Sequence, residues 1–253
     1  MPAFDASDGV RIAWREEGEG RPILLVHGFA SNARVNWFST SWTSALTEAG
    51  YRIIAPDLRG HGDSGKPHDT ASYGIERLAR DQGELLDHLG LGAVVTMGYS
   101  LGGRIAAHLA VMAPERVSAL IIGGLGDQLI KGFPKAGAVA DALRAESDAD
   151  VTDPVAQGFR TFAGQTGGDL LALAACMEAG RANLTGEDLN GLSMPVLIAV
   201  GEEDEVAGDP QKLAAAIPGA ELALIPRRDH MRAVGDKVHK KAVLEFLGRL
   251  ARG

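Results

Sequence analysis

Residues 93–103 read AVVTMGYSLGG, an apolar run that leads directly into a Gly-x-Ser-x-Gly sequence. The run at 93–97 predicts a buried strand, and the apolar stretch 101–113 predicts a central helix. A strand that turns at once into a helix forces the residue at the turn into a strained backbone conformation. Side chains two positions to either side would clash there, which explains Gly98 and Gly102. The pattern therefore predicts that the Ser100 hydroxyl is held out at the edge of a sheet.

Similar elements alternate along the rest of the chain. Buried strands are predicted at 23–27, 52–55, 93–97, 117–122, 196–200 and 221–225, and helices at 75–89, 101–113, 210–217 and 237–250. Continuous apolar runs suit strands that are buried on both faces, as in a parallel sheet. Two shorter runs, 4–6 and 10–16, flank Ser7-Asp8-Gly9 and predict a hairpin. The fold class is therefore α/β, a mostly parallel sheet of the eight-stranded type with an antiparallel N-terminal hairpin.

The alternation breaks once, between residues 124 and 194. This stretch contains no convincing strand, but it holds helical pieces at 136–146, 154–162 and 170–179. A structureless loop of this length is improbable in a compact domain. We therefore expect a small helical cap at 124–194 that lies over a core formed by residues 1–123 and 195–253.

Composition limits the possible partners. With 25 basic and 33 acidic residues the net charge is −8, which argues against electrostatic binding of nucleic acid over a wide surface. The apolar runs fall far short of the ~20 residues that a membrane span needs. The single cysteine, Cys176, excludes an internal disulfide, and no Cys/His cluster has metal-ligand spacing. The N-terminus shows no secretory signal, so a cytoplasmic protein with a small-molecule substrate and neither metal nor cofactor is expected.

A serine hydroxyl is a weak nucleophile that needs a base and a group that orients the base. His230 follows the predicted strand 221–225 through a short polar loop, which places it at the same sheet edge as Ser100. The acid should come from the end of the strand 196–200, which is followed by Gly-Glu-Glu-Asp-Glu. We select Asp204, while Glu203 and Glu205 remain physically possible.

With these residues the chain resembles the α/β-hydrolase family, in particular its serine esterase-like members. The order Ser100, Asp204, His230 is the family's nucleophile–acid–histidine order, residues 201–204 match its Gly-x-x-Asp turn, and residues 27–29 match its His-Gly loop. Residues 57–65 resemble the loop after its fourth strand. The resemblance implies an oxyanion hole built from the backbone N–H groups of Phe29 and Leu101. One departure is Asp229 before the histidine, where relatives often have glycine.

Several features have a simpler structural reading. Residues 60–65 fit a dinucleotide fingerprint and most of a P-loop, but both motifs must open directly into a helix, and here Pro67 follows. We therefore interpret residues 57–65 as a structural loop. Trp37 and Trp42 are expected to pack a helix against the core rather than contact substrate, and Cys176 is expected to be a buried apolar residue. Arg104 is expected to make structural ion pairs.

The leading hypothesis is a cofactor-independent serine hydrolase that cleaves a small, mostly apolar ester through an acyl-enzyme on Ser100. The resemblance leaves open a C–C bond hydrolase of ring-fission diketones, an acyltransferase or perhydrolase, and a small-molecule receptor on the same fold. Haloalkane dehalogenase and epoxide hydrolase activities are disfavoured, because members of the family with those activities carry Asp where this chain has Ser100.

Overall fold

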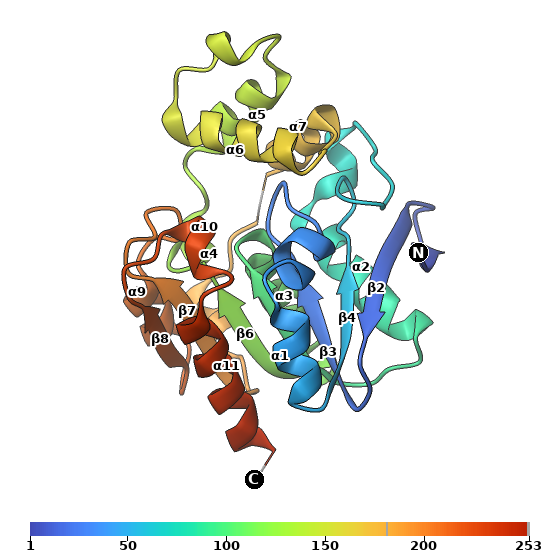
Figure 1. Cartoon of the computed structure of the whole chain (residues 1–253), viewed down its shortest axis with the longest axis vertical. Coiled ribbons are helices and arrows are strands. Elements are labelled where there is room, and N and C mark those ends of the chain that lie inside the picture. The colour runs from blue at the N-terminus through green and yellow to red at the C-terminus, as the bar shows by residue number, and fades with distance from the viewer. Residues whose placement is uncertain (181, 252–253) are drawn as a thin grey trace.

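The computed structural model describes residues 1–180 and 182–251, and at the centre of this part of the chain lies one sheet of eight strands (Figure 1). The strands are β1 (Ala3–Asp5), β2 (Arg11–Glu17), β3 (Arg21–Val26), β4 (Tyr51–Pro56), β5 (Val94–Tyr99), β6 (Val117–Gly123), β7 (Val196–Gly201) and β8 (Glu221–Ile225). Their order in the sheet is β1-β2-β4-β3-β5-β6-β7-β8. β1 pairs antiparallel with β2 and β2 with β4, whereas the other neighbours are parallel. The predicted fold class, with its N-terminal antiparallel hairpin, is confirmed.

The central strands are mostly apolar because helices cover both of their faces. Every residue of β5 and of β7 is buried, while the edge strand β8 is only partly buried. This is the pattern expected of a parallel sheet enclosed between two helical layers. Each strand predicted from the sequence is present, and its ends lie within one or two residues of the prediction.

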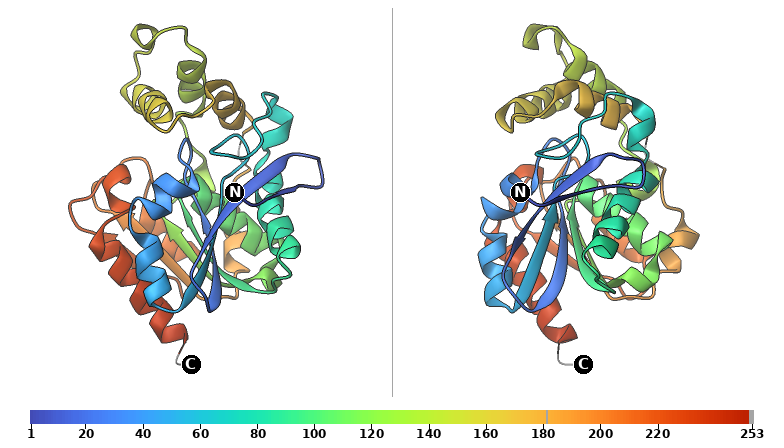
Figure 2. Two further views of the ribbon diagram at one scale, coloured as in Figure 1. Left: turned by 45° about the vertical axis from the view of Figure 1, so that its right-hand side comes forward. Right: turned by 90° about the vertical axis from the view of Figure 1, so that its right-hand side faces the viewer.

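The helices form a layer on each face of the sheet. Those of the core are α1 (Trp42–Glu48), α2 (Ile75–His88), α3 (Leu101–Met112), α9 (Pro210–Ala216), α10 (His230–Ala233) and α11 (Lys237–Leu250). Residues of α1 and α11 pack in one apolar cluster, and those of α2, α3 and α9 pack in the other. Figure 2 shows α1 on one side of the sheet and α2 and α3 on the other.

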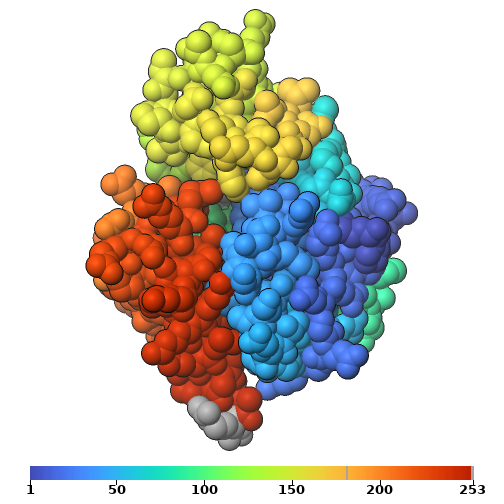
Figure 3. Space-filling view, viewed as in Figure 1, coloured from blue at the N-terminus to red at the C-terminus, as the bar shows by residue number. Residues whose placement is uncertain are grey.

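Between the end of β6 and the start of β7, the residues that the structure describes form helices and loops. They are α4 (Gln128–Lys131), α5 (Ala136–Arg144), α6 (Pro154–Gln165), α7 (Leu170–Glu178) and α8 (Gly186–Asn190). α5 packs against α6 and α7, and these three helices stand beyond the edge of the sheet where the parallel strands end (Figure 1). In the space-filling view of Figure 3 they form a block over the junction of the N-terminal and C-terminal parts of the core. The division into a core and a cap stays a prediction.

Within residues 1–180 and 182–251, no helix combines the length and the apolar character needed to cross a bilayer.

Three of the buried histidines have a pKa that burial lowers, and this makes the stability of the protein depend on pH. Burial lowers the pKa of His27, His108 and His239 to about 4, from an ordinary value of 6.5. Between these two pH values the unfolded chain binds more protons than the folded one. Protonation of these histidines therefore does not reduce the free energy of unfolding above pH 6.5. As the pH drops from 6.5 toward 4, the free energy of unfolding falls by up to about 1.4 kcal/mol per pH unit for each histidine.

We expect this loss to appear in urea unfolding curves recorded at pH 8, 6 and 5. His239→Gln removes one of the three groups, and the glutamine amide can still donate to the Ala233 carbonyl that Nδ1 of His239 now contacts at 3.1 Å. The free energy of unfolding of this variant should fall less steeply between pH 6 and 5 than that of the wild type. Equal pH slopes would show that His239 is not kept neutral by burial.

Candidate active site

Ser100 occupies the turn between β5 and α3 in a conformation that few L-residues adopt. Its φ and ψ are 54° and −113°, and its backbone N–H donates to the Gly123 carbonyl of β6 at 2.8 Å. A Cβ atom at Gly98 would lie 2.0 Å from the Gly102 oxygen, and one at Gly102 would lie 1.9 Å from the Val26 oxygen. Both glycines are therefore required by the close approach of α3 to the sheet, as the sequence predicted.

Asp204 and His230 contact each other at the edge of the sheet where the parallel strands end, as does β5 before Ser100. Asp204 follows β7 and His230 follows β8, and Nδ1 of the histidine lies 2.8 Å from one carboxylate oxygen of the aspartate. The other oxygen accepts the backbone N–H groups of Val206 and Ala207, at 3.0 and 2.9 Å. A carboxylate only accepts, so in the neutral imidazole the proton sits on Nδ1 and Nε2 carries the lone pair. Glu203 and Glu205 are exposed, which leaves Asp204 as the acid that reaches the ring.

Ser100 and His230 line the same cavity, whose volume is about 200 Å³. Phe29 also lines it, and so do Phe159 and Phe162 of α6. The structure thus brings together the three polar residues that the sequence selected, although they come from three different strand ends. Leu101 lies beside Ser100 and begins α3, where the first N–H groups of a helix have no partner within it.

Besides Asp204, two neighbours hold the backbone that carries His230, and the sequence did not indicate one of them, Tyr99. The Tyr99 hydroxyl donates to the His230 carbonyl at 2.5 Å, and the two rings lie 5.4 Å apart. Asp229 accepts the Arg232 N–H at 2.8 Å and so caps the short helix that starts at His230. The aspartate that stands in place of the more usual glycine therefore has a structural role at this position.

The loop that carries Phe29 is held by side chains from outside it. Asn36 accepts the Gly28 N–H at 3.1 Å, His61 accepts the Ala30 N–H at 3.1 Å and Asp57 accepts the Ala33 N–H at 2.8 Å. Ala30 has a φ of 59°, so this loop also stores backbone strain.

Thr166, at the C-terminal end of α6, also contacts the loop that carries Phe29. The Thr166 hydroxyl donates to the Ala30 carbonyl at 2.7 Å. Both polar backbone groups of Ala30 are therefore bound by side chains, one from the core and one from the segment between β6 and β7. Neither contact could be read from the sequence, because the partners are separated by 31 and 136 positions.

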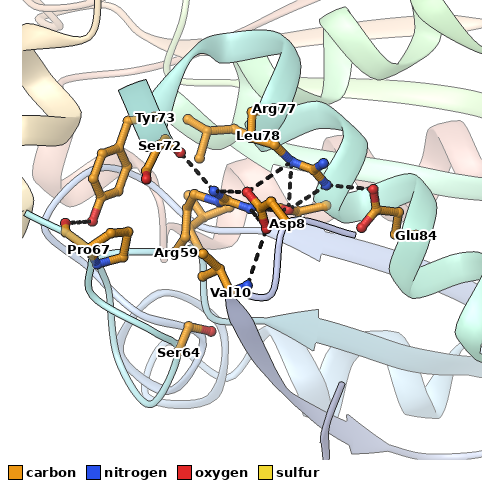
Figure 4. A network of polar contacts seen from close by, with 12 residues as sticks. Asp8, Val10, Arg59, Ser64, Pro67, Ser72, Tyr73, Arg77, Leu78 and Glu84 are labelled. Atoms are coloured by element: carbon orange, nitrogen blue, oxygen red, sulfur yellow. Dashed lines mark hydrogen bonds and ion pairs between the residues drawn. The ribbon is translucent and has the colours of Figure 1, made fainter. Parts of the chain in front are cut away.

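The loop with Asp57 and His61 is anchored in turn by a buried ion-pair network (Figure 4). The Arg59 side chain is fully buried and makes two hydrogen bonds to Asp81 of α2, at 2.7 and 2.8 Å. It also reaches Asp8 in the N-terminal hairpin at 2.7 Å and the Ser72 carbonyl at 2.8 Å. The Arg59 guanidinium lowers the pKa of the Asp8 carboxyl. This network joins the hairpin, the loop and α2 into one support.

The remaining sequence features have structural roles. The Gly60 N–H closes a turn on the Gly65 carbonyl at 2.8 Å, and α2 begins only at Ile75, so residues 60–65 do not open into a helix as a nucleotide-binding loop would. Trp42 is buried and donates to the Val234 carbonyl at 2.7 Å. Cys176 is buried on α7. Arg104 is buried and donates a hydrogen bond to the Leu129 carbonyl at 3.2 Å.

An open α/β sheet with a serine at a strand–helix turn, and a histidine backed by aspartate at the same edge, is the arrangement of the α/β hydrolases. Residues 21–175 match the sequence profile of the alpha/beta hydrolase fold, and the chain belongs to this family.

The relatives that match nearly the whole chain include a chloroperoxidase, a hydrolase and an esterase. The chain is 29% identical to a non-heme chloroperoxidase of Kitasatospora aureofaciens, over 98% of this chain and 100% of that protein. Among solved structures, a hydrolase from Pseudomonas aeruginosa PA01 is 27% identical with a TM-score of 0.82, over 98% of each chain. A thermophilic esterase from Thermogutta terrifontis is 26% identical with a TM-score of 0.72, over 99% of this chain and 97% of that one. The protein is a hydrolase of this family with esterase and haloperoxidase neighbours.

Proposed function

We propose that the protein is a serine hydrolase that cleaves a small, mostly apolar ester through an acyl-enzyme on Ser100. The observation that carries the proposal is a strained serine that shares a cavity with a histidine whose Nδ1 is bound to a buried aspartate. This combination supplies a nucleophile, a base with its lone pair on Nε2, and a group that stabilises the imidazolium.

The reaction proceeds in two halves. His230 Nε2 takes the hydroxyl proton of Ser100 as Oγ attacks the acyl carbon, and the N–H groups of Phe29 and Leu101 stabilise the oxyanion. Each such donor contributes about 2.7–4 kcal/mol to the lowering of the barrier. The imidazolium then gives its proton to the leaving alcohol. In the second half His230 deprotonates water, whose oxygen attacks the acyl carbon. The bond from this carbon to Oγ then breaks, the imidazolium returns its proton to Oγ, and the acid leaves.

The cavity supports a small apolar substrate. Its lining includes aromatic and aliphatic side chains such as Phe159, Phe162 and Val234 beside Ser100 and His230. The polar residues that also line it are Ser31, Asn36 and Thr40. A volume of about 200 Å³ is below the range of 300–1,000 Å³ that is typical of sites for drug-sized ligands. The esterase relative is consistent with this substrate class.

Reaction with a fluorophosphonate probe tests the proposal together with hydrolysis of p-nitrophenyl acetate. We expect the folded protein to be labelled on Ser100 with one probe per chain, and to lose its esterase activity in proportion to labelling. A folded protein that neither takes up the probe nor hydrolyses the ester would contradict the proposal and favour a receptor role. Peptide mapping that finds the probe on another residue would remove Ser100 from the mechanism.

The chloroperoxidase relative favours a second candidate, acyl transfer to hydrogen peroxide. If peroxide replaces water in the second half-reaction, the same acyl-enzyme yields a peracid and free Ser100. An assay with acetate and hydrogen peroxide distinguishes acyl transfer to peroxide from hydrolysis, because only transfer to peroxide forms peracetic acid.

A further inference from the structure

We propose that two pockets on either side of Ser100 receive the two halves of the ester, and that the substrate joins a very short acid to a larger apolar alcohol. This inference rests on the proposed function and names its substrate class.

The two pockets meet at Ser100 and differ in size about tenfold. The larger one, about 200 Å³, contains His230 and is walled by Phe162 and Val234 among others. The smaller one, about 20 Å³, is walled by Leu125 and Met177 among others. We call them the histidine pocket and the methionine pocket.

Both pockets share Ser100, Phe29 and Phe159. The rings of Phe29 and Phe159 lie 5.8 Å apart at an angle of 67°, so this edge-on pair forms the partition between them.

The chemistry of ester cleavage assigns each pocket to one half of the substrate. In the tetrahedral intermediate the acyl carbon carries the serine oxygen, the oxyanion, the leaving oxygen and the acyl chain. The leaving oxygen must lie within hydrogen-bond reach of the histidine that protonates it. His230 lines only the histidine pocket, so the alcohol lies there. The acyl chain is then directed to the other side of Ser100, into the methionine pocket.

The sizes of the pockets limit what each one accepts. The methionine pocket, at about 20 Å³, has about a tenth of the free space of the histidine pocket, so we assign to it the short chain of an acetyl or propionyl group. The histidine pocket has room for a ring-sized apolar alcohol, and its lining includes Met231 and Val234 as well as Phe162.

The partition is held firmly enough to act as a limit. Phe159 lies between Phe29 and Phe133, whose ring centroid is 6.0 Å from its own. The Thr166 hydroxyl at the C-terminal end of the same helix is bound to the Ala30 carbonyl at 2.7 Å, next to Phe29. The loop with Phe29 and the helix with Phe159 are thus bound to each other. A longer acyl chain therefore fits only if a side chain that lines the methionine pocket is replaced by a smaller one.

Paired variants and a matrix of esters test the assignment. Met177→Ala enlarges the methionine pocket, Leu125→Ala does so from another wall in case the first variant folds poorly, and Phe162→Ala is the matched control in the histidine pocket. Each protein is assayed for kcat/KM on p-nitrophenyl acetate, butyrate and hexanoate, and on the acetates of methanol and 1-naphthol. The first series varies the acid at constant alcohol, and the second varies the alcohol at constant acid.

We expect the wild type to prefer acetate over hexanoate by about 100-fold, since one methylene that fits or fails to fit a pocket changes kcat/KM by 10- to 200-fold. Met177→Ala or Leu125→Ala should raise the hexanoate-to-acetate ratio at least tenfold and leave the naphthyl-to-methyl ratio unchanged. Phe162→Ala should change only the second ratio.

Three results would overturn the assignment: a wild type that cleaves hexanoate as well as acetate, an acyl preference that responds to Phe162→Ala, or one unmoved by both enlarging variants. These results are distinct from failure of the proposed function, in which no ester is cleaved and Ser100 takes up no phosphonate.

Discussion

Ser100→Ala is expected to lower ester turnover by about 10³-fold or more. Removal of one member of a serine–histidine–aspartate set abolishes covalent catalysis and leaves only the contribution of binding and of the oxyanion donors. The loss should appear in kcat, because the hydroxyl is needed to form the acyl-enzyme and not to hold the ester in the cavity. Steady-state kinetics with p-nitrophenyl acetate measure the effect.

The same substitution should leave the fold intact. Alanine keeps a Cβ atom, so the backbone penalty at a φ of 54° is the same for both residues. We expect unfolding free energies within about 0.5 kcal/mol of each other. Ser118→Ala, at an exposed position of β6, is a matched serine replacement that should preserve turnover. An alanine variant at position 100 that retains more than a tenth of the wild-type rate would exclude the acyl-enzyme.

The second large effect concerns stability and arises at Gly102. The Cβ atom of an alanine there would lie 1.9 Å from the Val26 oxygen and 2.6 Å from the His27 oxygen. Both contacts are with backbone atoms of β3 and the loop after it, so no side chain can rotate away to relieve them. The helix α3 would have to move off the sheet, and we expect a loss above about 4 kcal/mol, which single substitutions rarely exceed. Urea unfolding measures it.

Gly248→Ala is the control for this prediction. Gly248 lies in α11, and a Cβ atom there would have no atom within 4 Å. Because glycine is a poor helix former, the change should stabilise the protein by about 0.5–1 kcal/mol. A Gly102→Ala protein that unfolds within 1 kcal/mol of the wild type would mean that α3 does not approach β3 as closely as described.

The sequence predicted the elements of the sheet well because its strands are short runs of branched residues between Gly, Pro and Asp. It gave no bounds for α1, although Trp37 and Trp42 were expected to pack a helix on the core. This helix has only seven residues, too few for a helical period to stand out. The short helices α4, α8 and α10 were missed for the same reason.

Some residues of the candidate site could be predicted from the sequence, and others could not. Ser100, Asp204 and His230 could be selected because each one follows a recognisable strand, and strand ends converge at one edge of a parallel sheet. The groups that hold them could not be selected in this way. Tyr99 is 131 positions from the residue whose carbonyl it binds, and Thr166 is 136 positions from Ala30. A local pattern contains no information on such pairs, which exist only after the chain has folded.

The bond from Thr166 to Ala30 has a consequence for protein engineering. Grafting residues 124–194 from a relative would import new pocket walls and, with them, a new range of acids and alcohols. The graft would also replace the Thr166 hydroxyl, which donates to the carbonyl of the strained Ala30 beside Phe29. A chimera that omits a serine or threonine at this position is therefore expected to bind new esters and to turn them over slowly, and restoring the hydroxyl is the first correction to make.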